Sequence, residues 1–271
     1  MAEKAKKKVV KKSAPKSSKA KSTAKGSKAE KPTWKPTEKA KKTATQKRWI
    51  AMLLWALAIG GEVFTILWTL RQDPINMVYV YVAIGVIGLL AIIGSLLWKR
   101  ANDADPATRS EPVKFFFQNQ LGAFIAIIAF LPLILFILAN KNMEKNDKTI
   151  ATIAAAAVMA TAVLFGIDWD PSSQEDYQTE SERIQLLHPD GKDEVTWTTF
   201  GNYYHLCEDA SAVNLDSSDD TIFTGTVGDA HADGKKGITL EIDEEIEQCG
   251  WEIPEGVDID AMIEEIRAER E

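Results

Sequence analysis

The sequence predicts a membrane protein with about four transmembrane helices, a small soluble α+β carboxy-terminal domain and a disordered amino-terminal tail. Two observations lead to this fold class. The first is charge: residues 1–48 carry a net charge of +15, residues 49–167 of +1 and residues 168–271 of −23. The second is that the near-neutral middle block contains the long apolar stretches of the chain. A charge asymmetry of this size indicates that the two ends of the chain meet different surroundings.

The amino-terminal tail, residues 1–48, consists largely of Lys, Ala, Ser, Thr and Pro. It has too little apolar surface to offset the cost of ordering the backbone, about 1–2 kcal/mol per residue, so we expect it to be disordered. The first apolar run begins near Trp49, too late for a signal peptide, and we expect the tail to be retained. Its lysines are expected to contact anionic lipid headgroups, at up to about 1 kcal/mol each.

Four apolar stretches are predicted to cross the bilayer: residues 49–70, 77–98, 115–139 and 149–167. About 20 residues at 1.5 Å rise per residue cover a hydrocarbon core of roughly 30 Å. The fourth stretch is rich in alanine and less apolar, so a buried soluble helix is its alternative interpretation.

The distribution of Lys and Arg near the span ends predicts the orientation, because these residues are kept in the cytoplasm. The tail places the amino terminus in the cytoplasm, and four spans then place the carboxy-terminal domain there as well. Three lysines in the third loop, Lys141, Lys145 and Lys148, oppose this assignment. The alternative is an odd number of crossings with an extracellular carboxy-terminal domain.

Glu62 is the one acidic residue well inside a predicted span. A carboxylate near the centre of a bilayer costs on the order of 3 kcal/mol, so it normally faces the bundle interior, a partner or water. The sequence therefore makes Glu62 the intramembrane site candidate. The alternative is a protonated side chain without a role in transport.

Motifs for catalysis are absent from the sequence: it contains no GxxxxGK[ST], no HExxH and no GxSxG. We therefore expect neither an enzyme nor a cofactor. Two histidines and two cysteines could form a zinc site, namely His205, Cys207, His231 and Cys249.

The two cysteines have further interpretations that depend on the compartment. Cys207 and Cys249 should be buried thiols in a cytoplasmic domain and a disulfide in an exported one. Such a bridge would stabilise the domain by roughly 4 kcal/mol in the chain-entropy model.

The carboxy-terminal domain, residues 168–271, is expected to be a small α+β module. Helices are predicted over residues 172–187, 227–233 and 260–269. A hairpin of residues 195–200 and 203–207 and a strand over residues 238–242 complete the prediction. Because its surface is acidic, repulsion from phosphate disfavours nucleic-acid binding by this domain.

A family resemblance covers residues from about 31 to 250. It is carried by Trp197-Thr198-Thr199-Phe200-Gly201-Asn202, Tyr204-His205-Leu206-Cys207, Gly225-Thr226-Val227, Ala230-His231, Gly234-Lys235 and Glu247-Gln248-Cys249-Gly250. Upstream it includes Leu96-Leu97-Trp98-Lys99-Arg100-Ala101 and Phe115-Phe116-Phe117-Gln118-Asn119-Gln120-Leu121-Gly122. These strings resemble a family of uncharacterised actinobacterial membrane proteins, which implies no known reaction or ligand. The Tyr-His-Cys string is also distantly similar to small metal-binding modules, whose second close pair of cysteines is absent here.

Three functions are compatible with these features. The first is a non-enzymatic interaction or scaffold protein in the cell membrane, whose basic tail contacts lipid and whose acidic domain recruits a protein partner. The second is a membrane tether for nucleic acid, bound through the tail. The third is a small transporter or channel that uses Glu62.

Overall fold

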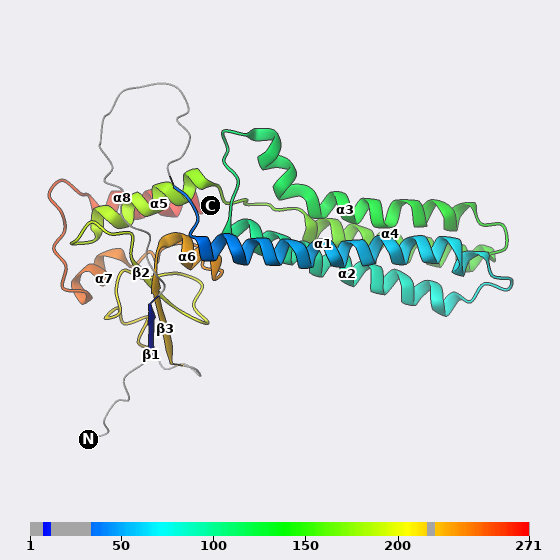
Figure 1. Cartoon of the computed structure of the whole chain (residues 1–271), viewed down its shortest axis with the longest axis horizontal. Coiled ribbons are helices and arrows are strands. Elements are labelled where there is room, and N and C mark those ends of the chain that lie inside the picture. Colours follow the sequence, from blue (N-terminus) through cyan, green and yellow to red (C-terminus); the bar gives the residue numbers. More distant parts are fainter. Residues whose placement is uncertain (1–7, 12–33, 216–219, 271) are drawn as a thin grey trace, which may run out of the picture. The chain divides into compact units, whose positions relative to one another are not determined.

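The computed structural model describes residues 8–11, 34–215 and 220–270 (Figure 1). The chain forms two compact units. The helical unit comprises residues 42–172, and the soluble unit comprises residues 1–41 together with 173–271.

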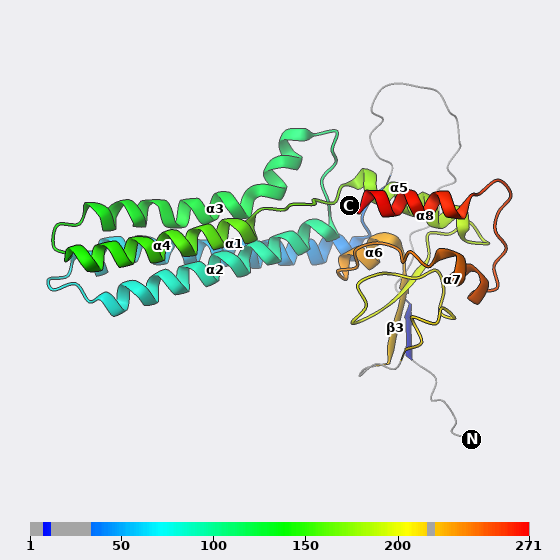
Figure 2. The same cartoon turned by 180° about the vertical axis from the view of Figure 1, so that it is seen from behind.

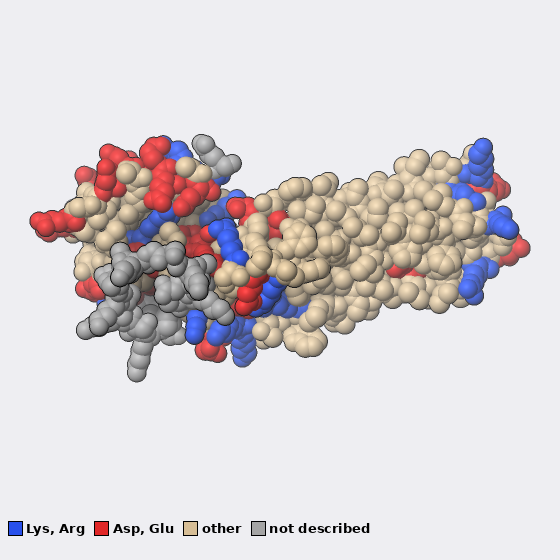
Figure 3. Space-filling view, turned by 90° about the horizontal axis from the view of Figure 1, so that it is seen from above, with Lys and Arg blue, Asp and Glu red and all other residues tan. Residues whose placement is uncertain are grey.

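Among the described residues, four helices are long and apolar enough to cross a membrane, which supports a membrane protein. They are α1 (Glu38–Leu67), α2 (Met77–Ala104), α3 (Pro112–Ala139) and α4 (Lys145–Gly166), with a short 3₁₀ helix, η1 (Thr69–Arg71), after α1. Less than half of each apolar window is buried within the structure, so many large apolar side chains point outwards. Figure 3 shows these outward surfaces almost free of charged side chains.

The bounds of these helices differ from the predicted spans mainly at the ends. The first helix begins at Glu38 instead of residue 49, and the second continues past residue 98 to Ala104. Hydropathy marks the part of a helix that suits the hydrocarbon core, whereas backbone hydrogen bonding continues into polar sequence beyond it.

Small residues bring α2, α3 and α4 close together. At Gly166 of α4, an added Cβ would lie 2.5 Å from the backbone nitrogen of Ala123 in α3. At Gly88 of α2, an added Cβ would lie 2.2 Å from a methyl carbon of Val158 in α4. These glycines permit backbone approaches of the kind that stabilise helix pairs in membranes.

Helix α1 joins the other three through one buried or half-buried stripe, which we call the α1 seam. Its members follow one another at alternating spacings of four and three residues, the repeat of a helix-packing seam. They are Ala44, Arg48, Ala51, Trp55, Ala58, Glu62, Thr65 and, in η1, Thr69. Small residues alternate along the seam with residues that can form hydrogen bonds.

The soluble unit contains a three-stranded sheet and four helices around one apolar core. The sheet order is β1 (Lys8–Lys11), β3 (Thr221–Gly225) and β2 (Val195–Thr198), with β1 parallel and β2 antiparallel to β3. The helices are α5 (Gln174–Leu187), α6 (Val227–Ala232), α7 (Ile242–Gln248) and α8 (Ile259–Glu269). Helices α5 and α8 lie side by side (Figure 2), joined by ion pairs of Arg183 with Glu265 and Glu269.

The α+β prediction is correct in class and wrong in part of the sheet. The predicted hairpin is reduced to one bridge between Thr196 and His205. On its other edge β2 pairs with β3, a strand that the sequence analysis missed. Residues 238–242 form no strand beyond the bridge of Ile238 to Tyr204, and Ile242 begins α7.

The predicted disorder of residues 1–48 is wrong where the chain is described within that range. Residues 8–11 form β1, and α1 begins at Glu38, well before the apolar stretch. The rest of the predicted disorder, residues 1–7 and 12–33, lies outside the described residues. Residues 34–41 belong to the soluble unit, so this unit combines both ends of the chain.

Candidate functional site

Three residues of the α1 seam, spaced seven apart, form hydrogen bonds with other helices. Arg48 donates to the carboxylate of Asp105, the C-cap of α2, at 2.7 Å. Trp55 donates from Nε1 to the carbonyl oxygen of Ala91 at 3.3 Å. Glu62 accepts from the backbone N–H of Leu133 in α3 at 3.1 Å. The seam therefore fixes α1 against α2 and α3 through polar contacts.

Glu62, the intramembrane candidate, is 3% exposed and lies against α3 at Pro132. Proline lacks an N–H and its ring disturbs the preceding helical turn. The Glu62 carboxyl group accepts from the next residue of that helix, so it supplies an acceptor where the backbone pattern is disturbed. This contact gives Glu62 a structural role in addition to its ability to bind a proton.

The structure brings Cys207 and Cys249 together as a disulfide with a Cα–Cα distance of 6.0 Å. Cys249 is the C-cap of α7, and Cys207 lies in the loop after the Thr196–His205 bridge. The disulfide therefore attaches this loop to the end of α7.

The four residues of the predicted zinc site do not come together as ligands. The two cysteine sulfurs are bonded to each other, and His205 Nδ1 lies 2.6 Å from Glu245 Oε1. His231 Nε2 lies 2.9 Å from Glu180 Oε2. Across residues 8–11, 34–215 and 220–270, no group of three or more His, Cys, Asp or Glu side chains is arranged to hold a metal ion.

Both histidines of that set form buried pairs with glutamates instead. Glu245 is 2% exposed, and its second oxygen accepts the backbone N–H of Leu206 at 2.9 Å. Because Leu206 precedes Cys207, this glutamate fixes the loop beside the disulfide.

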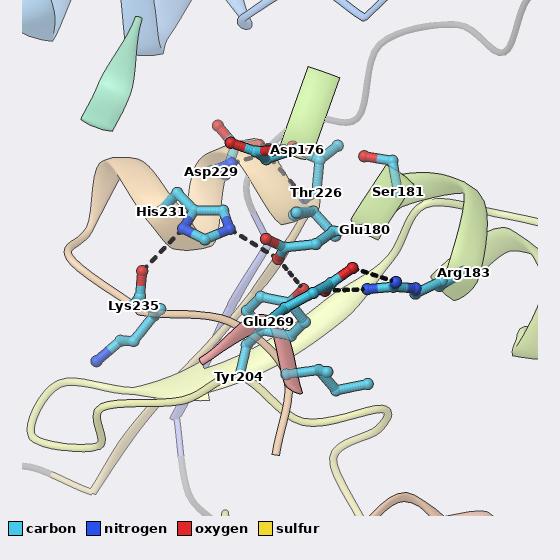
Figure 4. A network of polar contacts seen from close by, with 12 residues as sticks. Asp176, Glu180, Ser181, Arg183, Tyr204, Thr226, Asp229, His231, Lys235 and Glu269 are labelled. Atoms are coloured by element: carbon cyan, nitrogen blue, oxygen red, sulfur yellow. Dashed lines mark hydrogen bonds and ion pairs between the residues drawn. The ribbon is translucent and has the colours of Figure 1, made fainter. Parts of the chain in front are cut away.

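The second pair lies in a larger network, formed by α5, α6 and the Tyr204 segment (Figure 4). Glu180 Oε2 accepts hydrogen bonds from His231 and from the hydroxyl of Tyr204, the latter at 2.6 Å. His231 Nδ1 lies 2.9 Å from the carbonyl oxygen of Lys235, and its ring stacks on Tyr177 at 4.0 Å. Both ring nitrogens thus face oxygen atoms, an arrangement that an imidazole with a proton on each nitrogen satisfies.

The charges of this network shift several pKa values. Burial opposes ionisation of Glu180, but the charge and hydrogen bond of His231, the hydrogen bond of Tyr204 and the charge of Arg183 together lower its pKa. Burial, followed by the charge of Glu180, raises the pKa of Tyr204 well above its ordinary value. Burial also raises the pKa of Asp193, which accepts from Ser181 and from the backbone N–H of Val227.

Residues 34–41 pack on the same part of the soluble unit. Trp34 meets Tyr177 edge-on at 5.1 Å and lies over Gly228, where an added Cβ would be 2.5 Å from the indole. Thr37 donates to Asp229 of α6 at 3.0 Å and caps the start of α1 by accepting from the N–H of Ala40. We call this set of contacts the juxtamembrane clamp.

Replacing Trp34 with alanine should destabilise the soluble unit by about 2 kcal/mol, below the 3–5 kcal/mol of a fully buried Trp because this side chain is half-buried. The measurement is the urea dependence of proteolysis within the soluble unit, using the full-length protein in detergent. Lys35→Ala, at the exposed neighbouring position, is the control and should leave the midpoint unchanged. Equal midpoints for the two variants would show that the clamp contributes no stability.

Sequence reasoning missed Glu180, Glu245, Trp34 and Thr37. The available signal was weak: Trp34 is the lone aromatic residue of the tail, and Glu245 lies between apolar neighbours at helical spacing. Pairing with a distant histidine leaves no local pattern. His188 is the half-buried C-cap of α5 and packs on Trp251, and burial lowers its pKa.

Comparison with known proteins finds no matching family model, and no curated protein or solved structure that is similar to the chain. The actinobacterial family resemblance is therefore still a prediction.

Proposed function

We propose that this chain is a non-enzymatic interaction protein of the cell membrane, in which the basic tail and the acidic soluble unit act together on the cytoplasmic face. The juxtamembrane clamp is the observation that carries this proposal. Residues 34–41 precede the first span and residues 173–271 follow the last one. The contact between Thr37 and Asp229 supports one compartment for the segments on both sides of the bundle.

The charge distribution supports the cytoplasm as that compartment. Residues 1–48 contain 18 Lys and Arg residues, and the loop between α2 and α3 together with the adjoining helix ends contains four more. On this face the lysines of the tail would meet anionic headgroups, while the acidic soluble unit suits a partner with a basic surface.

The disulfide favours the other face, because such bridges persist mainly in oxidising compartments. Lys and Arg near the span ends set the orientation while the chain inserts into the membrane, whereas a disulfide can form later, whenever two thiols meet an oxidant. The proposal therefore follows the charge distribution. The rival arrangement places both the tail and the soluble unit outside the cell.

Reporter cysteines at three exposed positions should decide between these arrangements: Asn142 between α3 and α4, Ser110 between α2 and α3, and Glu255 in the soluble unit. With a membrane-impermeant maleimide, Asn142→Cys should react in intact cells, and Ser110→Cys and Glu255→Cys only after permeabilisation. The chain without a reporter gives the background. Reaction of Glu255→Cys in intact cells would overturn the cytoplasmic assignment, and reaction of Ser110→Cys and Glu255→Cys on different sides would overturn the shared face.

A further inference from the structure

Glu62 is isolated from other charges within the helical unit. The apolar parts of α1 to α4, residues 50–67, 77–98, 115–139 and 149–166, contain no other Asp, Glu, His, Lys or Arg, and their other ionisable side chains are Tyr79 and Tyr81. The carboxyl group accepts from Leu133 of α3, and Ile87 of α2 packs beside the adjacent Gly61. Within these four helix segments, no cation therefore neutralises the carboxylate.

The α1 seam differs on the two sides of Glu62. Towards the start of α1 it continues as Ala58, Trp55 and Ala51, whose side chains offer no hydroxyl or amide oxygen. Towards the end of α1 it continues as Thr65 and Thr69, which are 1% and 2% exposed.

The Thr65 hydroxyl donates to the carbonyl oxygen of Gly61 at 2.7 Å, and the seam beyond it reaches the loops at the end of the bundle. Asn140, the C-cap of α3, donates to the carbonyl oxygen of Leu70 at 2.8 Å. We call this end, with the loops of residues 72–76 and 140–144, the far end. Charged side chains occur there on both loops and on the adjoining helix ends, namely Arg71, Asp73, Lys141, Glu144, Lys145, Asp147 and Lys148.

A buried carboxyl group without a cation has two stable states: it is neutral with a proton, or ionised with water admitted to it. Hydroxyl groups both donate and accept hydrogen bonds, so Thr65 and Thr69 can pass a proton or hold a water molecule between Glu62 and the far end. Alanine and indole side chains on the other side cannot serve as such a path, because indole N–H only donates.

We propose that Glu62 is a proton-binding site that equilibrates with the far side of the membrane through Thr65 and Thr69. When Glu62 loses its proton, the carboxylate still accepts the hydrogen bond from the Leu133 N–H of α3. The unneutralised charge then draws water into the contact between α1 and α3. The site thus couples the pH of the far side to the attachment of α1. This role goes beyond that of an interaction protein, which requires no titration within the membrane.

Dicyclohexylcarbodiimide is a suitable probe, because it modifies protonated carboxyl groups in apolar surroundings. The acid O–H adds across one C=N bond of the reagent to give an O-acylisourea, which rearranges to a stable N-acylurea without any leaving group. Sealed membrane vesicles with the full-length protein would be prepared in both orientations, and protease resistance of the soluble unit would assign the orientation independently. Mass spectrometry then measures the modified fraction of the Glu62 peptide.

When the far end faces the bath, the modified fraction should follow the protonated fraction of one titrating site. Once the bath pH exceeds the pKa of that site, modification should fall about tenfold for each further pH unit. With the soluble unit facing the bath, bath pH should have no effect. Glu62→Gln should abolish modification of this peptide. The isosteric pair Thr65→Val and Thr69→Val should keep the modification and lose its dependence on bath pH.

Three outcomes would overturn the proposal: no modification at any pH, a response to pH on the side of the soluble unit, or an unchanged response in the Thr65→Val, Thr69→Val variant. Because orientation is assigned by protease, these outcomes do not depend on which compartment the soluble unit occupies.

Discussion

Replacing Glu180 with alanine should destabilise the soluble unit by about 3–5 kcal/mol, the range for breaking a buried ion pair by removing one partner. The substitution removes the acceptor of both His231 and Tyr204. It leaves the His231 ring, which is 5% exposed, and the buried phenol of Tyr204 without their hydrogen bonds to Glu180. Proteolysis in urea of the full-length protein in detergent measures the loss.

Glu182→Ala is the matched control, because Glu182 is an exposed acid of the same helix and contacts Gln178 at the surface. It should change the free energy of unfolding by less than about 0.5 kcal/mol. If Glu180→Ala were as stable as this control, the network would not contribute to folding.

The same glutamate predicts a pH dependence. Because the pKa of Glu180 is lowered from 4.5, its contribution is fully present above pH 4.5 and is lost as the pH falls through the lowered value. The difference in free energy of unfolding between the natural chain and Glu180→Gln should therefore shrink below pH 4.5. A difference that stayed constant into this acidic range would contradict the lowered pKa.

Replacing both Cys207 and Cys249 with serine should destabilise the oxidised protein by about 4 kcal/mol. The bridge spans a sequence separation of 42 residues, and its removal restores conformational freedom to that loop in the unfolded chain. The same urea and protease measurement applies.

Reduction provides the internal control for the disulfide. A reductant should lower the stability of the natural chain to that of the double variant and leave the variant unchanged. If the natural chain were insensitive to reductant, the bridge would not stabilise the soluble unit.

The helical unit could be predicted from the sequence because each span depends on a local property, the hydropathy of about 20 consecutive residues. The position of Glu62 was evident for the same reason. Its contact with Leu133, 71 residues away, was not, since no local pattern specifies which helix a seam faces.

The soluble unit was harder to predict because long-range pairing decides it. Strand β3, residues 221–225, is short and has only two large apolar side chains, and it pairs with two segments distant in sequence. His205 and His231 were singled out as metal ligands because the sequence showed their chemistry and not their partners, Glu245 and Glu180. The helical start of α1 was missed because lysine-rich sequence lacks an apolar stripe, although lysine and alanine favour helix.

The juxtamembrane clamp also imposes an order on synthesis. Trp34 and Thr37 leave the ribosome first, but Tyr177 and Asp229, which they contact, are translated only after all four spans. In the proposed topology, the soluble unit can therefore form these contacts only when the bundle has inserted with an even number of crossings. If one span failed to insert, Trp34 and the residues that it contacts would lie on opposite sides of the bilayer. Formation of the juxtamembrane clamp would therefore indicate correct insertion.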